Sequence, residues 1–314
     1  MYNMTNSKVQ EPSPALTLLK EKMSHFVTVE GIEYAMNFVP RSTDVIISTS
    51  PKCGTTWMQQ ILHQLRSGGD MSFADIDEHV PFIDLAYFVG QDLDAEHKYQ
   101  PRCFKTHFPC ESCPKGANYI VIFREPCAAF YSSYNFFSQG NYFQSQEISV
   151  DEFVRSFHLS ATGMGSNYFK HLLSWWPHRN DPNVLFLLYE EMLQDLESSV
   201  RAVASFIGID DEARIANAVK MSTFDYMKQY RVKFMNHLVS RSRNKAMGFP
   251  EETRLQRVAS GPATKALEMM EECTKLDIQK MWTETIGKEL GFHDYKQFRE
   301  TWKKHFPVKE YKSE

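Results

Sequence analysis

Short apolar runs alternate with longer segments of helical periodicity over most of the chain. The apolar runs are rich in β-branched residues, which is typical of buried strands. Four such runs are predicted strands: 44–50, 102–106, 118–123 and 184–189. Segments with apolar residues three and four positions apart are predicted helices: 55–65, 126–137 and 195–206. The pattern therefore predicts the α/β class, with a parallel sheet covered by helices on both faces.

In such a sheet, ligands bind beyond the carboxyl ends of the strands. The segments that follow the predicted strands are therefore expected to carry the chemistry: 51–56, 105–109, 124–132 and 189–191.

The chain is predicted to form one P-loop-like domain over residues 16–306. Residues 1–15 look like a flexible leader, and 307–314 like a short tail. Between 231 and 262 the periodicity loosens and basic residues gather. A structureless stretch of that length is unusual in a compact domain, so we interpret it as a functional loop or lid.

The composition narrows the possible partners and the location. The 314 residues carry 35 Lys+Arg against 39 Asp+Glu, a net charge of −4, which argues against wholesale binding of nucleic acid. No run approaches the ~18 apolar residues of a membrane span. The N-terminus lacks the charged-then-apolar pattern of an export signal, and the six cysteines are scattered, so we expect reduced thiols and a cytoplasmic protein.

One pair of cysteines, Cys110 and Cys113, has the C-x-x-C spacing. No second pair and no histidine motif supplies the other ligands of a zinc site. We therefore predict no metal.

The strongest local signal is Ser50-Pro-Lys-Cys-Gly-Thr-Thr-Trp57, which follows a predicted strand and opens a predicted helix. Gly54 permits a tight turn, and the free N–H groups of the first helical turn attract an anion. The segment differs from the usual nucleoside-triphosphate loop because its lysine precedes the glycine, and no strand ends in a metal-binding aspartate. A tight turn with a surface lysine is the alternative.

Four segments, in this order, resemble the signatures of the cytosolic sulfotransferases. They are PKCGTTW at 51–57, KTHFP at 105–109, REP-x₅-SSY at 124–134 and LYEEM at 188–192. The resemblance extends from about residue 40 to about residue 300. It implies a central parallel sheet of about five strands, and transfer of a sulfuryl group from 3′-phosphoadenosine 5′-phosphosulfate (PAPS) to a hydroxyl or amine of a small molecule, leaving PAP.

The resemblance also implies which residues bind the donor. Those of the first turn would hold the 5′-phosphosulfate and stack on adenine: Lys52, Cys53, Gly54, Thr55, Thr56 and Trp57. Cys53 replaces the family's usual serine and should keep the backbone cradle. Arg124 and Ser132 match the pair that holds the 3′-phosphate. Further nucleotide contacts are expected from Tyr189, Ser222, Thr223 and Phe224; for Phe224, core packing is an equal alternative.

Lys105-Thr-His107 matches the catalytic motif of the family. An acceptor oxygen must lose its proton as it attacks, and histidine can take a proton near neutral pH. The resemblance makes His107 the general base. Lys52 and Lys105 would stabilise the transferring group by fixed positive charge.

The acceptor is expected to contact Phe82, Phe136 and Tyr168, although aromatic residues can equally belong to the core. A charged acceptor would need a carboxylate in this region, for which Asp84 is a candidate. The sequence does not identify the acceptor.

The chain departs from the family pattern near its C-terminus, so what it resembles is a divergent member of the family. The R-K-G lid motif is missing, and the nearest segment carries Arg257 and Gly261. Arg254, Arg257 and the pair Arg241 and Arg243 are all candidates to replace its contacts. The family's dimerisation segment is not recognisable, so a homodimer stays open. Two other functions also stay open: a P-loop-type kinase that uses ATP, and a catalytically silent nucleotide-binding protein.

Overall fold

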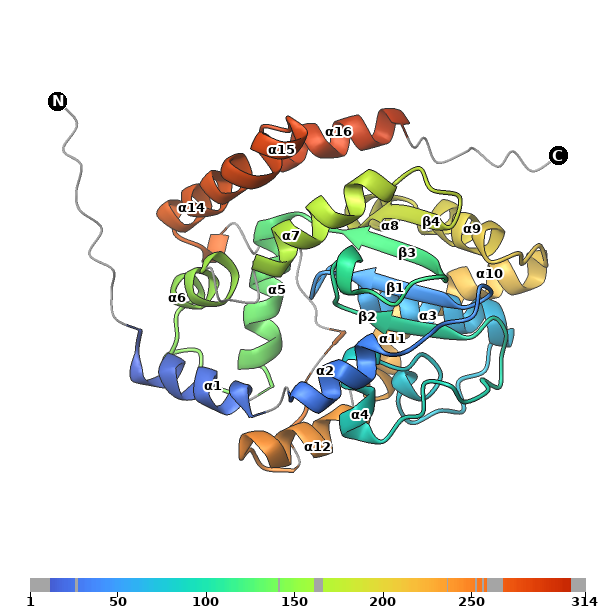
Figure 1. Ribbon diagram of the computed structural model, residues 1–314, viewed down its shortest axis with the longest axis horizontal. Coiled ribbons are helices and arrows are strands. Elements are labelled where there is room, and N and C mark those ends of the chain that lie inside the picture. The colour runs from blue at the N-terminus through green and yellow to red at the C-terminus, as the bar shows by residue number, and fades with distance from the viewer. Residues whose placement is uncertain are drawn as a thin grey trace.

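The computed structural model describes residues 12–25, 28–140, 142–160, 166–235, 237–251, 253–255, 257–258 and 268–305. Its centre is a parallel sheet with the strand order β2-β1-β3-β4 (Figure 1). The strands are β1 (Val45–Thr49), β2 (Cys103–Thr106), β3 (Asn118–Phe123) and β4 (Val184–Leu188). All four lie where the sequence predicts them. The expected number of about five is one too high for the described residues, in which β2 and β4 form the two edges.

Helices surround this sheet and make up most of the remaining regular structure among the described residues. The α-helices are α1 (Pro14–Ser24), α2 (Val29–Met36), α3 (Thr55–Ser67), α4 (Ala86–Val89), α5 (Pro126–Ser138), α6 (Val150–Val154), α7 (Ser166–Trp175), α8 (Tyr189–Gln194), α9 (Leu196–Phe206), α10 (Glu212–Met221), α11 (Phe224–Gln229), α12 (His237–Met247), α14 (Glu272–Trp282), α15 (Lys288–Leu290) and α16 (Tyr295–His305). Shorter helical turns are η1 (Ile76–Glu78), η2 (Ile83–Leu85), η3 (Cys110–Ser112), η4 (Arg155–Leu159), η5 (Trp176–His178), η6 (Arg231–Phe234) and η7 (Thr283–Gly287).

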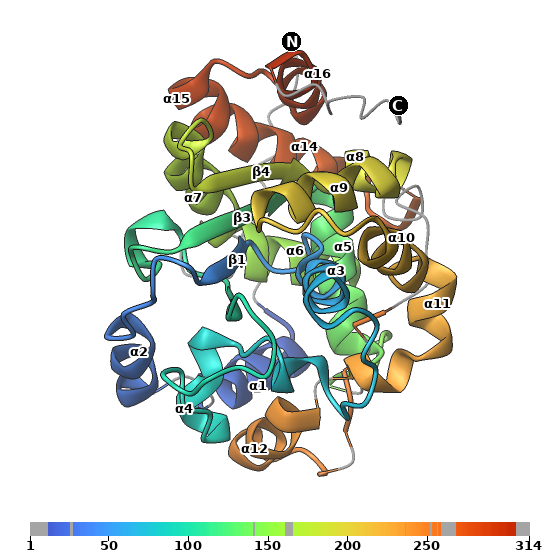
Figure 2. The ribbon, with the colours of Figure 1, turned by 90° about the vertical axis from the view of Figure 1, so that its right-hand side faces the viewer.

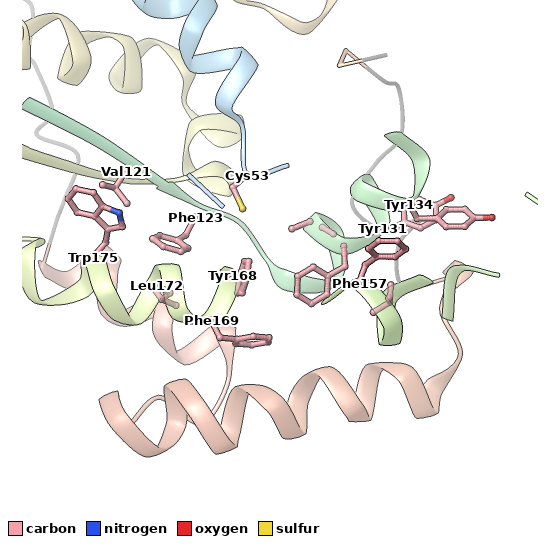
Figure 3. Close-up of a cluster of buried hydrophobic side chains, with 14 of the residues drawn as sticks. Cys53, Val121, Phe123, Tyr131, Tyr134, Phe157, Tyr168, Phe169, Leu172 and Trp175 are labelled. Atoms are coloured by element: carbon pink, nitrogen blue, oxygen red, sulfur yellow. The ribbon is translucent and has the colours of Figure 1, made fainter. Parts of the chain in front are cut away.

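Successive strand residues point to opposite sides of the sheet, and helices bury both sides. On one side Ile47 and Ile120 pack in a cluster with residues of α3, α9 and α10. On the other, Val121 and Phe123 face α7, as Figure 3 shows, and join a larger aromatic cluster. Burying each such side chain contributes about 1.5–3 kcal/mol. The predicted α/β class with helices on both faces is confirmed.

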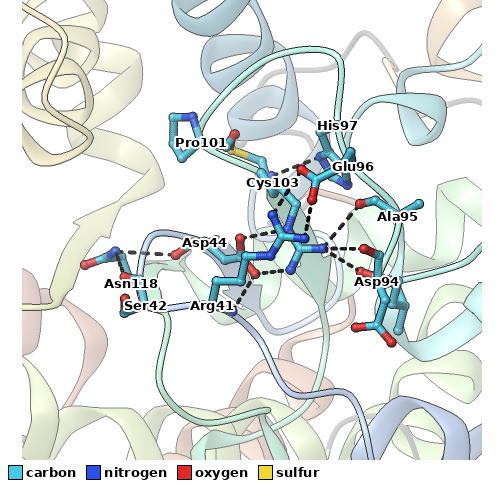
Figure 4. Close-up of polar contacts among 12 residues, drawn as sticks. Arg41, Ser42, Asp44, Asp94, Ala95, Glu96, His97, Pro101, Cys103 and Asn118 are labelled. Carbon is cyan, nitrogen blue, oxygen red and sulfur yellow. Dashed lines mark hydrogen bonds and ion pairs between the residues drawn. The ribbon is translucent and has the colours of Figure 1, made fainter.

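An ion pair closes the end of the sheet where β1 and β2 begin. Arg102 donates to both carboxylate oxygens of Asp44, over 2.9 and 2.5 Å, and to the main-chain oxygens of Leu93, Asp94 and Ala95 (Figure 4). Both side chains are almost fully buried. A bidentate pair with its remaining donors satisfied can be buried at little net cost. This end is structural, which leaves the carboxyl ends of the strands for chemistry.

Two regions expected to lack regular structure are partly helical. The predicted leader ends in α1, because Pro14 occupies the first turn and Ser13 accepts the N–H of Leu16 as a cap. The predicted lid contains η6 and α12, and α12 packs against α1 and α4 (Figure 2). Residues 307–314 lie outside the described residues. Within the described parts, no helix has both the length and the apolar character needed to cross a membrane.

Candidate active site

A cavity of about 1060 Å³ opens at the carboxyl ends of the strands. It is slightly larger than the ~300–1,000 Å³ of most single-ligand pockets, so it has room for a donor and an acceptor together. Fourteen of the residues predicted for the site line it: Lys52, Gly54, Thr55, Thr56, Trp57, Phe82, Lys105, His107, Arg124, Ser132, Phe136, Tyr189, Phe224 and Arg257.

The turn between β1 and α3 forms the floor of the cavity. Gly54 has φ +103°, and Lys52 also has a positive φ of +68°. A Cβ atom on Gly54 would lie 2.9 Å from the Tyr189 ring, so glycine is required for both conformation and space. Helix α3 begins immediately afterwards, and its free N–H groups make this turn suited to an anion.

The Cys53 side chain points away from the cavity. It is fully buried in the aromatic cluster, near Tyr168 in Figure 3, and burial raises the pKa of its thiol to about 12. Only the backbone of Cys53 can therefore serve a ligand here. This explains why a thiol can occupy a position where the family usually has a hydroxyl.

Arg124 lies beside this turn and contacts both the turn and α8. Its Nη1 donates to the main-chain oxygen of Lys52 over 3.1 Å, and its guanidinium lies 4.4 Å from the centre of the Tyr189 ring. Its Nε is buried without a partner among the described residues. An unsatisfied guanidinium donor at the edge of an anion-binding turn fits a phosphate.

Tyr168 does not occupy the acceptor position expected for it. Its side chain is 1% exposed and does not line the cavity, and its hydroxyl donates to the main-chain oxygen of Arg124 over 2.7 Å. Helix α7 packs this ring into the aromatic cluster on one face of the sheet. Tyr168 therefore positions Arg124 rather than contacting an acceptor.

Of the three residues expected at 222–224, only Phe224 reaches the cavity, with 47% of its side chain exposed. Ser222 is buried, and its main-chain oxygen accepts the indole N–H of Trp57 over 2.7 Å. Thr223 caps α11 by accepting the N–H of Tyr226. Both positions therefore support the site without lining it. Gly261 lies outside the described residues.

Positive charge accumulates around the cavity. The Lys52 ammonium lies 4.0 Å from the centre of the Phe136 ring, and its pKa falls to about 7 through burial and repulsion from Arg257, Arg124 and Lys105. Such mutual repulsion indicates a site built to receive a multivalent anion, whose charge would restore the pKa of Lys52.

A buried carboxylate that sequence reasoning missed organises two of these cations. Asp77 accepts from Lys105 Nζ over 2.6 Å, and its two oxygens accept from Arg257 over 3.0 and 2.7 Å. Burial alone would raise the pKa of Asp77, but Arg257 and Lys105 outweigh it and lower the value. Burial and Arg257 lower the pKa of Lys105 to about 8, whereas Asp77 opposes that change.

The segment around Asp77 also holds the predicted lid. Lys233 donates to the main-chain oxygen of Phe73 over 2.7 Å, and the N–H of Leu238 donates to Asp75 over 3.0 Å. Together with the ion pair between Arg257 and Asp77, these contacts join the lid to every second residue of the segment 73–77. Asp77 therefore connects the lid to Lys105.

His107 is held in one tautomer. Its Nδ1 lies 2.8 Å from the main-chain oxygen of Thr49, which can only accept, so Nδ1 carries the proton and Nε2 is free to take one. Burial, with repulsion from Lys105 and Lys52, lowers the pKa of His107 to about 4. The ring is therefore neutral at physiological pH.

Asp84 fixes the backbone that carries this histidine. One oxygen accepts the Thr106 hydroxyl over 2.5 Å, and the other accepts the N–H of His107 over 3.0 Å. Burial raises the pKa of Asp84 to about 6. Both oxygens already have partners, so Asp84 acts as a positioning residue for the Lys105–His107 strand end.

The comparisons with known proteins identify the family. A model of the sulfotransferase domain matches residues 42–256. The chain belongs to the sulfotransferase family. An amine sulfotransferase of Oryctolagus cuniculus is 31% identical over 68% of this chain and 72% of its own length. The luciferin sulfotransferase of Photinus pyralis is 29% identical over 76% of this chain and 71% of its own length.

Solved sulfotransferase-like structures share the fold. Retinol dehydratase, solved with androsterone and PAP, superposes with a TM-score of 0.65 at 19% identity, over 86% of this chain and 94% of its own. The mouse sulfotransferase SULT7A1, solved with PAP, gives 0.61 at 21% identity, over 83% and 90%. The predicted family and fold class are confirmed. Within the described residues, no three His, Cys, Asp or Glu side chains are grouped to hold a metal ion.

Proposed function

We propose that this sulfotransferase moves the sulfuryl group of PAPS to a hydroxyl group of a small, largely apolar molecule, with His107 as general base. One observation carries the proposal: Lys52, Lys105, Arg124 and Arg257 converge on one cavity, and three of them depress the pKa of the fourth. The PAP complexes of SULT7A1 and retinol dehydratase support the choice of donor.

The donor would lie along the turn between β1 and α3. The N–H groups that open α3, with the hydroxyl groups of Thr55 and Thr56, would receive the 5′-phosphosulfate, and Lys52 would add charge. Arg124 and Ser132, both at the cavity wall, would receive the 3′-phosphate. Trp57 stands at a ring-centre distance of 5.5 Å from Tyr189, and this aromatic pair would hold the adenine.

The transfer step would use His107 and the two lysines. His107 Nε2 would take the acceptor's hydroxyl proton as the oxygen attacks sulfur and the bond from sulfur to the phosphate oxygen breaks. Negative charge then grows on the departing phosphate, where Lys52 and Lys105 stabilise it. PAPS brings the activated sulfuryl group, so the protein's part is positioning, proton removal and charge stabilisation.

The acceptor would enter on the apolar side of the cavity. Phe82 packs edge-on against the His107 ring, with ring centres 5.1 Å apart. Further apolar walls come from Phe108, Phe136, Met247 and Leu255. Both oxygens of Asp84 are occupied, and no other carboxylate among the described residues lines the cavity to hold an ammonium group, which favours a hydroxyl acceptor over an amine.

We also propose a cytosolic location. All six cysteines are free thiols and five are buried, which suits a reducing compartment.

The donor assignment is tested by calorimetry with PAP and with ATP in the presence and absence of Mg²⁺. PAP is expected to bind at least about tenfold more tightly than ATP, because only PAP places a phosphate on Arg124 and Ser132. A Lys52→Met variant should weaken PAP binding, whereas Lys98→Met should not, because Lys98 is exposed, pairs with Asp70 and does not line the cavity. Tighter binding of ATP with Mg²⁺ would favour the kinase alternative instead.

A further inference from the structure

Helix α12 carries a buried arginine that the proposed reaction leaves unused. Arg243 is 5% exposed and lines the cavity. Its Nη2 donates to the Ser240 hydroxyl over 3.1 Å and to the Asn244 side-chain oxygen over 3.3 Å, and its guanidinium lies 5.1 Å from the centre of the Tyr142 ring. All these partners are neutral.

The charge of Arg243 therefore lacks a counterpart. None of the ion pairs among the described residues includes it, and its Nε is buried without a partner there. Burial lowers the pKa of its guanidinium to about 10, so it stays charged at neutral pH. A buried charge is normally paired, because an unpaired one costs several kcal/mol. By contrast, Arg102 and Arg257 are also buried and each pairs with an aspartate: Arg102 with Asp44, and Arg257 with Asp77, which Lys105 shares.

Arg243 belongs to the acceptor side of the cavity. Its helix packs against α1 and α4, away from the turn that opens α3 (Figures 1 and 2). Its apolar companions in the cavity wall are Val239 and Met247 from the same helix and Leu255 beyond it. The cations that most strongly affect Lys52 are Arg257, Arg124 and Lys105. Arg243 is not among these cations, although, after burial, repulsion from Arg257 and Arg254 also lowers the pKa of Arg243.

We propose that Arg243 binds an oxyanion carried by the acceptor, so that the preferred acceptors are hydroxy compounds bearing an acidic group such as a carboxylate. This inference rests on the proposed function and adds the chemical class of its acceptor. A planar guanidinium matches a carboxylate in geometry, and the surrounding apolar wall strengthens the interaction by excluding water. The carboxylate would sit at Arg243 while the hydroxyl of the same molecule meets His107.

The test compares matched acceptors that differ only in charge. A series of (4-hydroxyphenyl)alkanoic acids of increasing chain length is assayed with PAPS against the corresponding N-methyl amides. For the chain length that fits best, the wild-type protein is expected to favour the acid over the amide by about tenfold or more in kcat/KM, as for a hydrogen bond to a charged group. Arg243→Gln should bring this ratio to about one, and Arg243→Lys should retain part of it.

Two controls make the result specific. Arg241→Gln removes an exposed charge from the same helix and should leave the ratio unchanged. PAP binding to Arg243→Gln, measured by calorimetry, should match the wild type, and a loss of PAP affinity would make Arg243 a donor ligand and overturn the inference. Equal rates on acid and amide in the wild type would also overturn it. Failure to sulfate either member of any pair would instead count against the proposed function.

Discussion

Replacing His107 with alanine is expected to lower kcat by about 10²–10⁴-fold, the usual contribution of a positioned general base. The Thr49 contact presents Nε2 as the basic nitrogen, and burial keeps the ring neutral. No other group in the described residues combines these features with a place in the cavity wall. PAP binding should be nearly unchanged, because His107 is assigned to the acceptor rather than to the donor.

The pH profile adds an independent readout on the same residue. With a pKa of about 4 for His107, kcat/KM should stay high well below pH 6.5 and fall only as the ring becomes protonated near pH 4. An alkaline fall is expected near pH 7, because Lys52 loses its charge as the pH rises through its pKa of about 7 in the free enzyme. In the pH profile of kcat, this alkaline fall should lie at a higher pH than in the profile of kcat/KM, because the bound donor stabilises the charged form of Lys52.

The matched control is His178→Ala, which removes a histidine whose side chain is 46% exposed and which pairs with Asp181 on the surface. Its kcat should equal that of the wild type. If His107→Ala kept its kcat within about threefold of the wild type, well short of the loss of a general base, His107 would have to be removed from the mechanism.

Asp77→Asn is expected to have the second large effect, on stability and on catalysis together. Removing one partner of a buried charge cluster typically costs about 3–5 kcal/mol, because the remaining charges stay buried and uncompensated. Here Lys105 and Arg257 would both lose their carboxylate. Lys105 would also lose the interaction that opposes the fall in its pKa, so it would be less often charged near pH 8.

Urea unfolding and steady-state kinetics measure these two effects. The free energy of unfolding should fall by about 3 kcal/mol, and kcat by about 10²-fold, comparable to loss of one electrostatic contact to a transition state. Asp92→Asn, at an exposed carboxylate near the same loop, should change neither quantity. Wild-type stability and turnover in Asp77→Asn would show that the lid and Lys105 do not depend on this carboxylate.

The sequence is sufficient to predict the sheet and the floor of the site, because both are determined by residues that are close together in the sequence. The run that forms β1 is continuous with the glycine turn and with the first residues of α3, so periodicity and turn chemistry act on neighbouring residues. The same holds for Arg124, which directly follows β3. These segments meet because parallel strands bring their carboxyl ends to one edge.

The remaining features depend on contacts between distant segments. Asp77 pairs with Lys105 and Arg257, which are 28 and 180 positions away in the sequence. The residues next to Asp77 in the sequence therefore do not indicate that it lies between two cations. An aromatic residue such as Tyr168 suits a pocket as well as a core, and the packing of α7 places Tyr168 in the core. For α12, a polar and basic stretch resembles a loop in sequence, and contacts with α1 and α4 stabilise it as a helix.

The most direct test of the account is transfer of ³⁵S from labelled PAPS to a panel of hydroxyl acceptors by the purified wild-type protein, with Lys52→Met and His107→Ala run alongside. We expect the wild type to label a hydroxyl acceptor without any added metal, and both variants to be at least about 10²-fold slower than the wild type. Tight binding of PAP with no labelled product from any acceptor would contradict the account and leave a protein that holds the nucleotide without using it.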